Sequence, residues 1–95
     1  MSDPLSNIEL APRAIRDLKR LDRQTRKRVQ QAFQALEVDA ANLDVKAVAG
    51  HAPWRRLRLG EHRVLYRELA EETASRFLVA RVIDRRDLHR AIDQL

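Results

Sequence analysis

The chain has 95 residues, of which 44% are hydrophobic and 35% are charged, and its formal net charge is +5 at pH 7. These values predict one folded domain, residues 1–95, with a thin core and a heavily charged surface, and they exclude a disordered chain. The lack of cysteine excludes a disulfide framework and a thiolate metal site, and two glycines are too few for a glycine-rich phosphate loop. No apolar run approaches the roughly 20 residues that cross a bilayer, and no signal peptide is recognisable, so we expect a cytoplasmic protein.

The first part of the chain predicts a short strand and two helices. Residues 5–10 are mostly apolar, and Pro12 suits the first turn of a helix because its missing N–H would be unpaired there anyway. Asp22 can cap a second helix. Apolar residues recur at helical spacing in both segments, namely Ala14, Ile15, Leu18 and Leu21, then Val29, Ala32, Phe33 and Leu36. The simplest interpretation is a pair of antiparallel helices with a tight connection and basic, solvated outer faces.

After residues 39–53, which we interpret as a connection with a short strand or helical turn, the hydrophobic period changes to two. Two alternating segments, 53–60 and 62–69, predict strands joined by a tight turn at Gly60 and Glu61. Residues 70–75 are polar and predict a loop.

A near-continuous apolar run over 77–83 predicts a strand that is covered on both faces. Asp84 and Asp87 suit the cap and the third position of a last helix. The buried stripe of that helix is expected to comprise Leu88, Ile92 and Leu95.

The order of elements is therefore β-α-α-β-β-β-α. It predicts an α+β fold in which two antiparallel helices pack on one face of a small, mostly antiparallel sheet of three or four strands, with a short C-terminal helix. The expected core comprises Leu18, Leu21, Phe33, Leu36, Leu57, Leu59, Val64, Tyr66 and either Leu78 or Val79.

Arginines alternate with leucines over 53–60, which places the arginines on one strand face about 6.5–7 Å apart. The parity of the two following strands lets three more arginines join that face. The predicted face holds Arg56, Arg58, Arg63, Arg81 and Arg85. These guanidiniums repel one another unless an anion compensates, and a phosphodiester backbone or an acidic protein segment would do so. The alternative is an exposed strand face with arginines placed for solubility and edge protection.

His89 is the candidate for proton transfer. It follows Arg85 by four residues, which places both side chains on one face if the segment is helical. Imidazole has a pKa near neutrality and can pass protons at pH 7. His51 and His62 suit a loop and a strand end, and the histidines match no metal-binding motif, so we expect no metal and no small-molecule cofactor.

The segments WRRLRLGEHRVLY and LVARVIDRRDLHRAI, together with the helical region APRAIRDLKRLDRQTRKRVQQAFQAL, resemble the RelE/ParE superfamily of type II toxin–antitoxin toxins, with features of its RelE-like branch. The resemblance covers roughly residues 7–93. It implies a small α+β toxin whose concave sheet face engages mRNA on the ribosome. It also implies a cognate antitoxin that wraps and neutralises the toxin.

By position, Arg56 and Arg58 fall where RelE-like nucleases place two basic residues, and Arg63 falls on the arginine of a family run that reads GEHRVLY here. Arg85 or Arg86 matches an arginine at the end of the last strand, and His89 stands where many members have a catalytic tyrosine. The resemblance thus implies that Arg56, Arg58, Arg63, Arg85 and His89 are catalytic, and that Arg55, Arg67, Arg81 and Arg86 bind RNA.

Two departures from the family pattern leave several functions open. His89 stands where tyrosine is usual, and Arg58 stands where lysine is common. Because arginine is a poor general base, Arg58 is a poor candidate to accept a proton. The main hypothesis is a ribosome-dependent, metal-independent mRNA endoribonuclease. The alternatives are a ParE-like toxin that acts on DNA gyrase without cutting RNA, and a non-enzymatic RNA- or protein-binding module. We expect the antitoxin to bind across the basic face through an acidic or amphipathic segment, with Leu65 exposed among the arginines.

Overall fold

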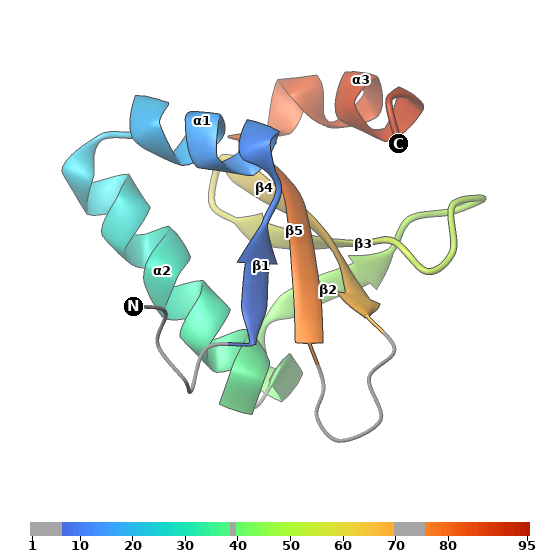
Figure 1. Cartoon of the computed structure of the whole chain (residues 1–95), viewed down its shortest axis with the longest axis horizontal. Coiled ribbons are helices and arrows are strands. Elements are labelled where there is room, and N and C mark those ends of the chain that lie inside the picture. Colours follow the sequence, from blue (N-terminus) through green and yellow to red (C-terminus); the bar gives the residue numbers. More distant parts are fainter. Residues whose placement is uncertain (1–6, 39, 70–75) are drawn as a thin grey trace.

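The computed structural model describes residues 7–38, 40–69 and 76–95, which form a five-stranded sheet with three helices packed against it (Figure 1). The strand order is β1-β5-β4-β3-β2; β1 runs parallel to β5, and the other neighbours are antiparallel. The elements are β1 (Ile8–Leu10), α1 (Pro12–Arg20), α2 (Arg23–Val38), the 3-10 turn η1 (Ala40–Asn42), β2 (Asp44–Ala47), β3 (Arg55–Leu59), β4 (His62–Leu69), β5 (Arg76–Asp84), the 3-10 turn η2 (Arg85–Asp87) and α3 (Leu88–Asp93).

This architecture confirms the predicted α+β class and the predicted order of its main elements. The additional strand, β2, lies inside the segment interpreted as a connection, where a short strand was one alternative. The turn between β3 and β4 is at Gly60 and Glu61 as predicted, and Gly60 adopts a positive φ of 56° that favours glycine. Residues 5–6 of the expected first strand, and the expected loop 70–75, lie outside the described residues. No helix in the described part of the chain is long and apolar enough to span a membrane.

The junction of α1 and α2 is fixed by Arg26, a residue of α2. Its Nε donates to the Leu18 carbonyl at 3.0 Å, and one of its terminal nitrogens donates to the Leu21 carbonyl, also at 3.0 Å. The last carbonyls of a helix have no partner within the helix, so these bonds satisfy acceptors at the end of α1. Arg26 therefore has a structural role and does not belong to an open basic surface.

The main core lies between the paired helices and one face of the sheet. Its buried members include Ala14, Val29, Ala32, Phe33 and Leu36 from the helices, and Leu57, Val64, Tyr66, Val79 and Val82 from the strands. The expected core residues are confirmed as buried or as partly buried at its margin, with Val79 rather than Leu78 the buried member of that pair. Ile15 belongs to the apolar residues at helical spacing in α1 but is 41% exposed, because α1 turns Ala14 and Asp17 inward.

A second, smaller core covers part of the opposite face. It consists of Val48, Leu65, Ile83 and Ala91, with Trp54, Leu88 and Ile92 packed against it. The prediction that the last strand is covered on both faces is confirmed near its end, where Ile83 joins this cluster. The prediction that Leu65 is exposed is wrong, because this cluster leaves it no accessible surface. Leu95 is also not part of the buried stripe, since it lies beyond the end of α3 and is 43% exposed.

Candidate functional site

The register of the sheet brings arginines of β3 and β4 together on the face opposite α1 and α2. Arg58 lies directly across from Arg63, and Arg56 lies across from Leu65. Cross-strand partners point to the same face, whereas the neighbouring Leu57 and Val64 point into the main core. The predicted parity of the arginines is therefore confirmed.

Arg85 joins this group from η2, directly after β5. Its backbone N–H donates to the Glu61 carbonyl, and its Nε lies 2.8 Å from Glu61 Oε2, so the β3–β4 turn holds it in place. We call Arg56, Arg58, Arg63 and Arg85 the arginine cluster. Lys46 of β2, which sequence reasoning did not single out, lies directly across from Arg56 and adds a fifth cation to the same face.

Two carboxylates compensate part of this charge. Asp44 Oδ1 lies 3.2 Å from an Arg56 terminal nitrogen, and Asp44 Oδ2 lies 4.0 Å from one of Arg58. Glu61 pairs with Arg85. Arg63 instead donates to two backbone carbonyls, those of Gly60 at 2.8 Å and His62 at 2.9 Å. Positive charge thus remains in excess over the cluster.

The pKa of Arg63 reflects this excess of positive charge. Partial burial lowers the pKa of Arg63 from its ordinary value, and the neighbouring charges of Arg58, Arg56 and Arg85 lower the pKa further, while Glu61 opposes the shift. Like charges directly opposite one another destabilise a sheet. An anion bound between Arg58 and Arg63 would relieve that repulsion, and guanidinium groups bind phosphate in bidentate geometry.

His89 lies on the exposed surface of α3. The expectation that it shares a helical face with Arg85 assumed one continuous helix. Arg85–Asp87 forms a 3-10 turn instead, and α3 begins only at Leu88, so the four-residue spacing does not align the two side chains in that way. The exposure of His89 leaves its imidazole accessible to a substrate.

The four residues expected to bind RNA occupy different surroundings. Arg86 is 82% exposed and lies beside the arginine cluster, with its Nε 3.0 Å from Asp84 Oδ1. Asp84 also accepts the Arg86 backbone N–H, which caps η2, and these bonds lower the pKa of Asp84. The predicted cap is therefore confirmed, although the element it begins is the 3-10 turn.

The other three lie outside the arginine cluster, although Arg81 is on the same sheet face, as predicted. Arg55 lies across from Tyr66 on the helix-covered face, and it opposes the rise in the Tyr66 pKa that burial causes. Arg67 stacks on Trp54, 5.9 Å from the ring centre, and its Nε is buried without a hydrogen-bond partner among the described residues. Arg81 forms a bidentate ion pair with Asp17, with nitrogen–oxygen distances of 2.8 and 3.1 Å.

Sequence reasoning missed the acids that partner these arginines. Asp44 and Lys46 flank the inward-pointing Val45, an alternation that signals a strand but is only four residues long. Asp17 had a clearer signal, because it is a charged residue three positions after Ala14 on the inward side of α1. A carboxylate at such a position requires a buried partner, which Arg81 supplies.

Comparison with known structures and families defines the class of protein. The fold matches that of a chain in the RelB-RelE antitoxin-toxin complex from Methanococcus jannaschii, with a TM-score of 0.67 and 23% sequence identity over 85% of this chain and 94% of that chain. No curated protein matches the sequence. The family described as ParE toxin of type II toxin-antitoxin system, parDE, matches residues 8–89. The chain therefore belongs to the ParE toxin family, within the RelE/ParE superfamily of type II toxin–antitoxin toxins.

Proposed function

We propose that this toxin is a ribosome-dependent mRNA endoribonuclease whose arginine cluster holds the scissile phosphate. The observation that carries the proposal is the pair formed by Arg58 and Arg63, which face each other across β3 and β4 with an Arg63 pKa lowered by burial and by neighbouring arginines. This pair favours a bound anion over solvent. The diester of an RNA backbone supplies such an anion with two non-bridging oxygens for bidentate contacts.

In the proposed reaction, the RNA 2′-hydroxyl attacks the adjacent phosphorus in line and loses its proton to a base. The bond to the leaving 5′-oxygen breaks, and that oxygen takes a proton, which leaves a 2′,3′-cyclic phosphate and a 5′-hydroxyl. The arginine cluster, Arg56, Arg58, Arg63 and Arg85, stabilises the charge that develops on the phosphorane oxygens. His89 transfers protons, and the ribosome supplies the alignment of the mRNA, which can contribute several kcal/mol.

The proposed partner is a cognate antitoxin. Membership of a type II toxin–antitoxin family and the likeness to a chain from an antitoxin–toxin complex support this partner. An antitoxin that covers the arginine cluster would compete directly with mRNA.

A second candidate is a toxin that acts on DNA gyrase without cutting RNA. It is favoured by the match of residues 8–89 to the ParE toxin family. In that function the arginines contact a protein or DNA surface, and His89 has no role in proton transfer.

The test is cleavage of mRNA on programmed ribosomes by the purified toxin, with the cut sites mapped. We expect Arg63→Ala and Arg85→Ala each to reduce the cleavage rate about 10²–10³-fold, since each removes one donor to the transition state. His89→Ala should reduce the rate about 10²–10⁴-fold, because it removes the group that transfers protons. Arg23→Ala, on the exposed surface of α2, is the charge-matched control and should cleave at the wild-type rate.

Each alternative has its own outcome. DNA-damage signalling in expressing cells, with intact mRNA, would identify the gyrase-directed toxin. An unchanged rate and pH profile for His89→Ala would remove His89 from the mechanism while leaving the arginine cluster in place. RNA binding without cleavage or toxicity would identify a binding module.

A further inference from the structure

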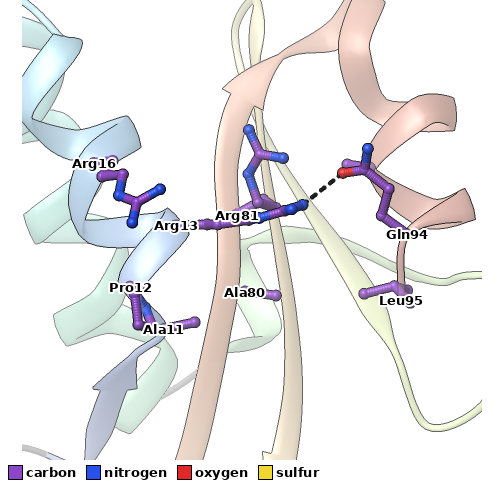
Figure 2. Close-up of a pocket in the computed structure, with 9 residues that line it drawn as sticks. Ala11, Pro12, Arg13, Arg16, Ala80, Arg81, Gln94 and Leu95 are labelled. Atoms are coloured by element: carbon purple, nitrogen blue, oxygen red, sulfur yellow. Dashed lines mark hydrogen bonds between the residues drawn. The ribbon is translucent and has the colours of Figure 1, made fainter.

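A hollow lies over β5, between α1 on one side and α3 on the other (Figure 2). Its volume is about 730 Å³. The apolar part of its lining comprises Ala11, Pro12, Ala80, Ala91 and Leu95. An Arg13 terminal nitrogen donates to Gln94 Oε1 at 2.7 Å and so links the two helices across the opening. We call this feature the α1–α3 pocket.

A smaller hollow of about 250 Å³ adjoins it and shares Arg13, Arg16, Arg81 and Gln94 with it. The lining of the smaller hollow adds Arg20 and Asp17, so that it holds four arginines and one carboxylate. An apolar surface and a cationic surface therefore lie side by side.

The single carboxylate is fully engaged within the fold. Both oxygens of Asp17 accept hydrogen bonds from Arg81, and Oδ2 also accepts the Val82 backbone N–H at 2.9 Å. Within the described part of the chain, Arg13, Arg16 and Arg20 have no carboxylate partner, and the contact of Arg13 is to a neutral amide. Three positive charges thus line the two adjoining hollows without a carboxylate partner: Arg13 and Arg16 border both, and Arg20 borders the smaller one.

We propose that the α1–α3 pocket binds an acidic, amphipathic helix of a partner protein. An aliphatic side chain of that helix fills the apolar hollow, and its carboxylates pair with Arg13, Arg16 and Arg20. This inference rests on the proposed function, in which a partner neutralises the toxin, and it adds a contact surface that shares no residue with the arginine cluster.

The spacing of the three arginines supports a helical occupant. Arg13, Arg16 and Arg20 follow one another at i, i+3 and i+7, so they form one stripe about 10 Å long on α1. Acidic residues at i, i+4 and i+7 of a second helix have the same two intervals in reverse order. Carboxylates accept bidentate hydrogen bonds from guanidinium groups, and they would replace the weaker amide contact of Arg13.

The lining favours a peptide over RNA. The residues around the α1–α3 pocket include no aromatic ring on which a base could stack. Recognition of single-stranded RNA relies on such stacking. Alanine, proline and leucine instead match an aliphatic side chain.

The experiment measures binding of a fluorescein-labelled synthetic helix to the full-length toxin by fluorescence anisotropy. The helix carries glutamates at i, i+4 and i+7 beside a stripe of leucines. The double variant Arg16→Gln and Arg20→Gln should weaken its binding about tenfold, a loss of roughly 1.4 kcal/mol. The control, Arg23→Gln and Lys27→Gln, removes the same charge from exposed positions of α2 and should change the affinity less than about twofold. A helix with serine in place of leucine should also bind about tenfold more weakly than the leucine helix.

Four results would overturn the proposal: no binding of the leucine helix, equal weakening by both double variants, equal affinity for the serine helix, or displacement by a single-stranded RNA that depends on Arg16 and Arg20. The last result would assign the pocket to nucleic acid. Because the readout is peptide binding, a toxin that cuts no mRNA can still pass this test. A toxin that cuts mRNA but fails it would contradict only this inference.

Discussion

Leu65 of β4 pairs with Arg56 of β3 on one side and with Arg81 of β5 on the other. Leu65 itself is nevertheless completely buried. Trp54, Val48 and residues of α3 form the cluster that covers it. The arginine cluster therefore borders an apolar patch that the protein itself conceals. Any ligand on this face meets charge beside α3 rather than an open hydrophobic surface.

Replacing Leu65 tests this arrangement. Leu65→Ala should lower the free energy of unfolding by about 2–5 kcal/mol, because it leaves a cavity in the second core. Urea denaturation gives the value. Val38→Ala is the control: Val38 is 86% exposed, and its loss should change the free energy of unfolding by less than about 0.5 kcal/mol. Equal small effects for the two variants would mean that α3 does not cover this face in solution.

Among the helices, the contact of Arg26 with the end of α1 ties the two longest helical elements together. Arg26→Met keeps much of the apolar stem but removes the donors to Leu18 and Leu21. We expect it to lower the free energy of unfolding by about 1–3 kcal/mol, since it removes the Arg26 donors at the helix end, although the Leu18 carbonyl keeps its bond from the Leu21 N–H. Thermal denaturation followed by circular dichroism measures the change.

Lys27→Met is the matched control, because Lys27 is the next residue along α2 and is exposed. The midpoint of its thermal denaturation should stay close to that of the wild type. If both variants lower the midpoint by the same amount, the loss reflects a general effect of surface charge on α2 rather than the contacts of Arg26.

The elements with strong periodicity could be predicted from the sequence. The stripe from Val29 to Leu36 defined α2, and the alternation of leucine and arginine defined β3. β2 gave a weak signal because, at four residues, it places only Val45 toward the core. An offset of pairing between β4 and β5 at Leu65 and Tyr66 also had no signal in the sequence.

The candidate site was predictable only where one turn determines it. The tight turn at Gly60 fixes the pairing of β3 with β4, and this places Arg63 opposite Arg58. The acids could not be predicted, because Asp44 and Asp17 reach their arginines from elements distant in the chain. Which arginines stay free is therefore decided by tertiary contacts. Whether the free ones act on RNA remains a prediction.

At the scale of the whole molecule, the arginine cluster and the stripe on α1 are two separate groups of positive charge within the described residues. A ligand that binds the folded state stabilises it by mass action. At equal ionic strength, phosphate should therefore raise the melting temperature more than chloride does. Arg58→Gln combined with Arg63→Gln should reduce that difference, because it removes the opposed pair on β3 and β4.

The control for this comparison is again Arg23→Gln combined with Lys27→Gln, which lowers the net charge equally. It should preserve the difference between phosphate and chloride. A reduction of the same size in both double variants would show that phosphate responds to total charge, and it would remove support for a phosphate site at Arg58 and Arg63.

The contact between Asp17 and the Val82 N–H has a consequence for self-association. β1 pairs with β5 over only three residues. Past that point, the Ala11 N–H donates to the Val79 carbonyl. The Asp17 carboxylate then accepts the Val82 N–H, which a further strand would otherwise bind. An unpaired strand edge is a template for intermolecular pairing, most of all in an apolar strand such as β5. Detachment of α1 would uncover that edge, so the docking of α1 protects the protein from edge-to-edge aggregation.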